Sequence, residues 1–238
     1  MKYKIILASN SPRRRELLAG LDVNFEVKVL NGIDESYPDD LDAYQVAEFI
    51  AQKKAEAYRS LLNEEESSAE ECLILTADTV VIAPAADEQN DQEGKGIILG
   101  KPKTADDAVR MLRMLSGKTH HVVTGVCLTT KDGQRHFSVT TEVSFKELTD
   151  WEINYYISHY RPFDKAGAYG IQEWIGYIGC TGLNGSYFNV MGLPVQRIYE
   201  EMLKMQEESC CLGNHDAERV NDKNLPLRML DKVSKKGL

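Results

Sequence analysis

The chain of 238 residues has few positive charges, no CxxC pair and no long apolar runs. Lys and Arg number 28 against 37 Asp and Glu, so the formal charge of −9 argues against a nucleic-acid-binding protein. No apolar run is long enough to span a membrane, and four apolar residues before Ser9 are too few for a signal peptide. We therefore expect a cytoplasmic protein without a nucleic-acid or membrane partner, although a small polyanion could bind where positive charge gathers in one cleft.

Metal and nucleotide motifs are also missing. The five cysteines form an odd set without a CxxC pair, which fits reduced cytosolic thiols better than disulfides or a zinc site. The histidines show no metal-ligand spacing, because adjacent His120 and His121 would point to opposite faces of a strand. There is no GxxxxGK[ST] loop, GxGxxG or GxSxG motif. Any triphosphate chemistry in this chain would therefore have to use scattered basic residues and a divalent ion.

The remaining composition is that of an ordinary globular protein, with 42% hydrophobic and 27% charged residues. Helical and strand-like segments alternate around a hairpin signal at Asp132-Gly133, which predicts an α/β fold with a mixed sheet. We predict one domain over residues 1–205, with an acidic insert loop at about 83–95. The polar residues 206–238 lack sustained periodicity and are predicted to form a loosely ordered tail.

Apolar spacing and capping residues predict the individual elements. Strands are expected at 4–7, 24–30, 72–82, 96–99, 119–130, 135–145, 175–181 and 187–190. Helices are expected to start at Pro12, after Asp42 (to about Leu62), after Thr104, after Thr149 (to about His159) and at Pro194 (to Met205).

The stretch Ser9–Arg15 places two small hydroxyls, a proline and three arginines between a predicted strand and helix. Pro12 suits the first helical position, and Ser11 or Ser9 can cap the helix. Free N–H groups at a helix start favour an anion, and arginine forks match phosphate oxygens. A capped helix with a solvated basic turn is the alternative.

One acid, Asp78, lies within otherwise uncharged residues Cys72–Ile82. A carboxylate there loses hydration, so it needs a cation, hydrogen-bond donors or a metal to stay ionised. A structural pairing with a lysine is the alternative. Lys53 and Lys54 flank the apolar face of the preceding helix, and periodicity does not say which one points inward.

Two further charged residues stand at turns or loops. Lys101 lies on a stiff turn between Gly100 and Pro102, and a surface lysine is the alternative. Glu35 lies in a polar loop, where a solvated acid is the alternative to a metal ligand.

Five sequence blocks together resemble the Maf family of nucleoside triphosphate pyrophosphatases. They are residues 8–18, 77–81, 99–102, 111–117 and 165–172. The resemblance extends from about residue 3 to 205, and five blocks in the family's order are far more specific than any single block. It implies a Maf/ITPase-like twisted mixed sheet flanked by helices, two lobes with a central cleft, and a homodimer.

Thr79 after Asp78, and the YGIQ sequence ending at Gln172, resemble the subgroup that acts on dTTP and UTP. The resemblance implies hydrolysis to the nucleoside monophosphate and pyrophosphate with Mg²⁺ or Mn²⁺, for sanitation of the nucleotide pool, modified pyrimidine triphosphates included. The same chemistry on 7-methyl-GTP or another non-standard triphosphate is one alternative. A nucleotide-binding regulator of cell division and septum formation is another, but a pure sensor needs no water-activating acid.

The resemblance also implies a role for each candidate residue. Asp78 is the implied proton acceptor, and Asp78 with Glu35 the implied metal site. Implied specificity residues are Arg13, Thr79 and Gln172, of which Thr79 and Gln172 suit the O4/N3 edge of uracil or thymine. Implied phosphate-binding residues are Ser9, Arg14, Lys54 and Lys101. The family's Ala-x-x-Lys-Ala pattern selects Lys54 over Lys53.

Overall fold

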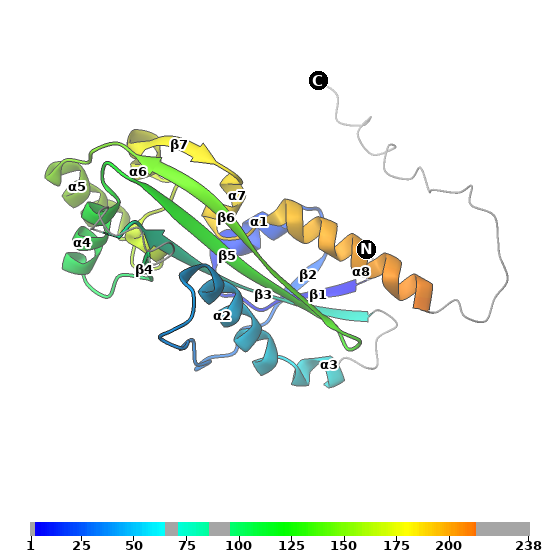
Figure 1. Cartoon of the computed structure of the whole chain (residues 1–238). Helices are drawn as coiled ribbons and strands as arrows, with labels where there is room; N and C mark the ends of the chain where they lie inside the picture. Colours follow the sequence, from blue (N-terminus) through cyan, green and yellow to red (C-terminus); the bar gives the residue numbers. More distant parts are fainter. Residues whose placement is uncertain (1–2, 65–70, 86–95, 213–238) are drawn as a thin grey trace, which may run out of the picture. The chain divides into compact units, whose positions relative to one another are not determined.

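The computed structural model describes residues 3–64, 71–85 and 96–212 (Figure 1). Within these residues, seven strands form one sheet in the order β2-β1-β3-β5-β6-β7, and β4 pairs with β3. The strands are β1 (Tyr3–Leu7), β2 (Phe25–Val27), β3 (Glu71–Ala83), β4 (Ile97–Leu99), β5 (Thr119–Thr129), β6 (Gln134–Phe145) and β7 (Cys180–Asn184). β1 runs parallel to β2 and β3, whereas the other pairs are antiparallel. The predicted α/β fold with a mixed sheet is confirmed.

Helices flank the sheet. They are α1 (Pro12–Ala19), α2 (Ala43–Ala57), α3 (Ser60–Glu64), α4 (Ala105–Leu115), α5 (Asp150–Tyr160), the 3₁₀ turn η1 (Ala166–Ala168), α6 (Trp174–Gly179), α7 (Tyr187–Met191) and α8 (Val195–Leu212). The predicted caps form, since Ser11 caps α1 and Thr149 makes a reciprocal capping box with Glu152. None of the helices in the described part of the chain is long and apolar enough to cross a bilayer.

The hydrophobic core lies on both faces of the sheet. On one face, Val46 and Ile50 of α2 pack against Val80 and Val123. A Cβ on Gly125 of β5 would lie 2.2 Å from the α2 backbone, so this glycine lets the helix lie directly on the sheet. The larger cluster joins α4, α5 and α6 to the strands, and its buried members include Val81, Leu112, Phe145, Ile153 and Ile175.

The expected two lobes are not confirmed. The chain divides into two compact units, residues 1–203 and 204–238, so the whole sheet lies in the first unit. α8 continues past Met205, the predicted end of the helix, to Leu212. Residues 213–238 lie outside the described residues, and the loosely ordered tail remains a prediction there. Residues 86–95 of the acidic insert are also outside the described residues, and the insert loop remains a prediction there. On either side of it, Ala83 pairs antiparallel with Ile97.

Two predicted strands are helices. Residues 175–181 begin as α6 and become β7 only at Cys180, and residues 187–190 form most of α7. Short apolar runs do not distinguish a buried strand from a buried helical turn. Local caps decide α7, because the Ser186 side chain accepts the N–H of Asn189 and Gly192 ends the helix at φ +116°.

Two further boundaries differ. The predicted strand 24–30 shortens to β2, and Val29 and Leu30 leave the sheet. The helix predicted to reach Leu62 breaks after Ala57, and α3 follows. At the break, the Tyr58 hydroxyl accepts the Leu30 N–H at 2.6 Å, which ties this loop to α2.

The sheet has a gap beside the middle of β3. β1 pairs with β3 as far as Leu75, and β4 pairs with it only from Val81 onward. Among the described strands, Thr76–Val80 therefore have a neighbour on the β5 side alone. The gap leaves the edge of a central strand facing a space into which neighbouring loops project.

Alternation along β3 places polar residues on both faces at this gap. Val80 packs against α2, so Asp78 lies on the α2 face. Thr79 lies on the opposite face with Val81, which belongs to the larger cluster. Because the strand is open on one edge here, both polar side chains reach the same space.

Candidate active site

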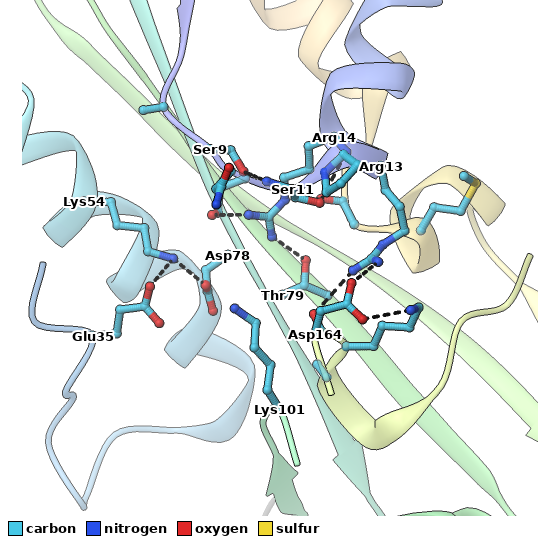
Figure 2. Close-up of a pocket in the computed structure, with 18 of the residues that line it drawn as sticks. Ser9, Ser11, Arg13, Arg14, Glu35, Lys54, Asp78, Thr79, Lys101 and Asp164 are labelled. Carbon is cyan, nitrogen blue, oxygen red and sulfur yellow. Dashed lines mark hydrogen bonds and ion pairs between the residues drawn. The ribbon is translucent and has the colours of Figure 1, made fainter. Parts of the chain in front are cut away.

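A cavity of about 430 Å³ opens at the gap in the sheet (Figure 2). Each of the predicted site residues lines it: Ser9, Arg13, Arg14, Glu35, Lys54, Asp78, Thr79, Lys101 and Gln172. They come from the start of α1, the loop after β2, α2, β3, the turn after β4 and the segment after α5. The structure thus brings together residues that are widely separated in the sequence, while their individual roles stay predictions.

Lys54 connects two carboxylates on one side of the cavity (Figure 2). Its Nζ lies 2.7 Å from Asp78 Oδ1 and 2.9 Å from Glu35 Oε1. Partial burial of Glu35 opposes its ionisation, but the hydrogen bond and charge of Lys54 lower the pKa of Glu35 overall. The neighbouring Lys53 instead contacts Asp34 at 2.8 Å, outside the cavity lining. The inward lysine is therefore Lys54.

Arg14 is half-buried in the wall of the cavity and bonded to the protein. Its Nε donates to the Gly192 carbonyl and its Nη1 to the Ala77 carbonyl, both at 2.8 Å. Its Nη2 donates to Thr79 Oγ1 at 3.0 Å. Burial lowers the pKa of Arg14, although a guanidinium remains charged at neutral pH. Arg14 thus ties α1 to β3 and to the end of α7, with three N–H groups committed to these contacts.

Arg13 lies on the opposite side of the cavity from Lys54 (Figure 2). Its Nη1 donates to Asp164 Oδ2 at 2.7 Å, and Lys165 Nζ contacts Asp164 Oδ1 at 2.8 Å. Burial opposes ionisation of Asp164, but the bonds from Lys165 and Arg13 together lower its pKa to about 2. The Arg13–Asp164 pair therefore links α1 to the segment that carries Gln172.

Asp164, Lys165 and Glu173 are site-region residues that sequence reasoning missed. Lys165 Nζ also contacts Glu173 Oε1 at 3.0 Å, and the other Glu173 oxygen accepts the Tyr156 hydroxyl hydrogen. The same Tyr156 oxygen accepts the N–H of Gly170, which lines the cavity. The sequence signal that could have marked them is the pair of adjacent opposite charges, Asp164 and Lys165, beside a run of small residues. This network holds the segment before Gln172 against α5.

The entry to α1 offers hydrogen-bond donors. The Ser9 hydroxyl accepts the Ser11 N–H at 3.2 Å, which leaves its own hydrogen to donate to a ligand. Pro12 occupies the first turn of α1, as predicted. Figure 2 shows the Lys101 side chain reaching toward Asp78 from the turn after β4. The Gly100 carbonyl in that turn accepts the Gly167 N–H at 3.1 Å, which fixes its position.

Gln172 presents an unpaired acceptor. Among the described residues, its side-chain Oε1 is buried without a hydrogen-bond partner. A buried carbonyl oxygen without a donor costs free energy unless a ligand or water supplies one. Since Gln172 lines the cavity, a donor on a bound molecule can satisfy it.

Asp78 and Glu35 are the carboxylates that could hold a divalent cation here. Within the described residues, no cluster of three or more His, Cys, Asp or Glu side chains is arranged to bind a metal. The donor set fits Mg²⁺, which commonly takes one or two protein carboxylates and fills its other positions from substrate phosphates and water. No histidine of the described residues lines the cavity; His120 faces the buried Tyr169 and His121 faces Tyr44.

Comparison with known proteins adds the family. The chain matches the model of the Maf-like protein family over residues 4–205. A dTTP/UTP pyrophosphatase of Phocaeicola vulgatus is 57% identical over 204 residues, which cover 86% of this chain and 97% of that protein. Proteins of the same name from Parabacteroides distasonis and Flavobacterium johnsoniae are 52% and 45% identical, with 84% of this chain and 95% and 93% of theirs covered. The chain belongs to the Maf family.

Proposed function

We propose that this protein hydrolyses dTTP and UTP to the nucleoside monophosphate and pyrophosphate. The observation that carries the proposal is the half-buried Lys54–Asp78 pair, which shares one cavity with Arg13 and Lys101. Relatives named dTTP/UTP pyrophosphatase at 50–57% identity support the substrate class. Removal of unwanted or modified pyrimidine triphosphates from the nucleotide pool is the role that this activity would serve.

Asp78 is the proposed proton acceptor. It is the acid of the β3 gap, its Oδ1 lies 2.7 Å from Lys54 Nζ, and its carboxylate lines the cavity in which a water could be activated. The hydrolysis adds one water across the bond between the α- and β-phosphates, and the proton that water loses passes to Asp78. A binding-only regulator of division does not require such an acid, so the site favours an enzyme.

The cations around the cavity would neutralise the triphosphate. Lys54 and Lys101 lie beside Asp78, where negative charge develops on the departing pyrophosphate. The Ser9 hydroxyl and the N-terminal end of α1 would donate hydrogen bonds to phosphate oxygens. Arg14 would contribute its charge from within the wall, because much of its guanidinium already bonds to the protein.

A divalent cation, Mg²⁺ or Mn²⁺, is the proposed cofactor. Asp78 and Glu35 would hold it, with the oxygen ligands that such hard cations prefer. When bound, the ion would polarise phosphoryl oxygens and lower the pKa of bound water. Lys54, which contacts both carboxylates, would hold them in place when no cation is bound.

Arg13, Thr79 and Gln172 are the proposed specificity residues. The Gln172 amide, whose Oε1 is buried, suits the polar edge of a uracil or thymine ring, which carries both a donor at N3 and an acceptor at O4. Arg13 would position the same end of the substrate through its pairing with Asp164. The cavity is large enough for a ligand of nucleotide size.

A substrate panel tests the proposal. Pyrophosphate release from dTTP, UTP, CTP, ATP, GTP and 7-methyl-GTP should be measured with Mg²⁺ and with Mn²⁺. The proposal predicts the highest kcat/KM for dTTP and UTP and no release without a divalent cation. A preference for 7-methyl-GTP would overturn the pyrimidine assignment, and binding of all nucleotides without hydrolysis would favour the regulatory alternative.

We also infer a homodimer, which the family resemblance implies, and a cytoplasmic location, which the odd, unpatterned set of cysteines favours. Light scattering after size-exclusion chromatography tests the first inference, and cell fractionation the second. A monomeric mass at micromolar concentration would contradict the dimer.

A further inference from the structure

A buried threonine behind the cavity contacts the predicted specificity residue Thr79. Thr124 of β5 is fully buried, pairs with Thr79 in the β3–β5 register, and does not line the cavity. The two side-chain oxygens lie 3.0 Å apart. Thr124 Oγ1 also donates to the Asn189 carbonyl of α7 at 3.1 Å, while Arg14 Nη2 donates to Thr79 Oγ1 at 3.0 Å.

These contacts fix the direction of each hydroxyl. A guanidinium N–H only donates, a carbonyl oxygen only accepts, and each threonine hydroxyl has one hydrogen. Thr124 gives its hydrogen to the Asn189 carbonyl, so it can only accept from Thr79. The hydrogen bonds therefore run in one direction, from Arg14 through Thr79 and Thr124 to Asn189. Thr79 Oγ1 keeps one lone pair that can accept a hydrogen bond from a ligand in the cavity, and it has no hydrogen left to donate.

This polarity distinguishes pyrimidine bases. Uracil and thymine carry a hydrogen on N3, which a lone pair can accept, whereas N3 of cytosine is itself an acceptor. Gln172 alone cannot make the distinction, because its side-chain amide can turn over and present either its oxygen or its NH₂ group. A group whose hydrogen-bonding direction is fixed can make it, and Thr79 is such a group.

We propose that Thr124 is a positioning residue for base selection: it holds the Thr79 hydroxyl as an acceptor, so that the cavity takes a base with an N3 hydrogen and disfavours cytosine. The inference rests on the proposed pyrimidine triphosphate activity and deepens it. It adds a residue that touches no substrate and acts only through Thr79.

Thr124→Val tests the inference, because valine keeps the shape and removes the acceptor. The Thr79 hydroxyl can then turn its hydrogen into the cavity and donate to N3 of cytosine. We expect the ratio of kcat/KM for UTP to that for CTP to fall at least about tenfold, on the scale of one buried hydrogen bond. Thr124→Ser, which keeps the hydroxyl, should retain the wild-type ratio. Thr124→Ala removes the same acceptor and replaces the valine variant if that variant does not fold.

A matched control separates selection from packing. Thr129 is also buried in β5, but its hydroxyl accepts from Gln134 and does not reach the cavity. Thr129→Val should leave the UTP-to-CTP ratio unchanged even if it lowers the melting temperature. An unchanged ratio in a folded Thr124→Val or Thr124→Ala enzyme that still prefers UTP would overturn this inference alone. A wild-type enzyme that fails to hydrolyse UTP would overturn the proposed function itself, and this inference with it.

Discussion

Lys54 of α2 and Asp78 of β3 form a 2.7 Å ion pair in which the side chains are only 13% and 16% exposed. Removing one partner of such a pair leaves the other as an uncompensated, poorly hydrated charge. Lys54 also contacts Glu35 at 2.9 Å, so one ammonium group organises both carboxylates of the proposed cation site. The effect of removing Lys54 can therefore be compared with the effect of removing its sequence neighbour Lys53, which contacts Asp34 instead.

Lys54→Ala should reduce kcat/KM for UTP by at least about 100-fold, the scale for loss of a preorganised charge in an active site. Lys53→Ala is the matched control, because Lys53 contacts the exposed Asp34 outside the cavity and an exposed pair contributes little. Steady-state pyrophosphate release and thermal melting of both variants provide the measurement. Equal losses in the two variants would show that Lys54 has no special role.

Gln172→Ala should reduce the preference of the enzyme for UTP over GTP. The variant loses the buried Oε1 that lacks a partner among the described residues, and with it a contact that favours the correct base. We expect the UTP-to-GTP ratio of kcat/KM to fall by about tenfold or more. Kinetics with both nucleotides check this, and an unchanged preference profile would remove Gln172 from base reading.

His120 makes the stability of the fold depend on pH. Burial, with a smaller contribution from the charge of His121, lowers the pKa of His120 to about 3 from an ordinary 6.5. Below pH 6.5 the unfolded chain takes up a proton that the folded protein does not, so stability falls as pH falls toward 3. This single group contributes up to about 1.4 kcal/mol per pH unit.

His120→Phe should flatten that dependence, since phenylalanine cannot take up a proton and can occupy the aromatic cluster with Phe145 and Tyr169. Urea unfolding of both proteins at pH 7, 6, 5 and 4 provides the comparison. The variant is expected to lose less free energy of unfolding than the wild type over this range. If the free energies of unfolding of the two proteins fell in parallel with pH, His120 would take up its proton in the folded protein as readily as in the unfolded chain.

Much of the fold could be predicted because the sequence signals of many of its strands and helices are local. The apolar run around Asp78, the Asp132-Gly133 turn and the caps at Ser11 and Thr149 each specify an element by themselves. The helices at 174–179 and 187–191 could not be predicted in this way. Their short apolar runs suit either element. The caps at Ser186 and Gly192 decide the helix at 187–191, and an apolar pattern alone does not reveal them.

The site shows the same division. The uncharged residues around Asp78 marked it as unusual. Helical periodicity did not distinguish Lys53 from Lys54, and the family's Ala-x-x-Lys-Ala pattern selected Lys54. Arg14 and Arg13 look alike in the sequence, whereas only the fold shows that Arg14 is bonded within the wall and that Arg13 meets Asp164. Long-range contacts of this kind leave no periodic signal.

Product analysis of UTP hydrolysis by the wild type and by Asp78→Asn tests the central claim most directly, with Asp34→Asn as a control acid outside the cavity lining. In the presence of Mg²⁺ we expect the wild type and the Asp34→Asn control to release one UMP and one pyrophosphate for each UTP hydrolysed, at similar rates. Asp78→Asn should still fold, because Lys54 keeps its contact with Glu35, and it should lose at least about 100-fold in turnover, the typical scale for a general base. Release of UDP and phosphate by the wild type, or a near-normal rate in Asp78→Asn, would contradict the account.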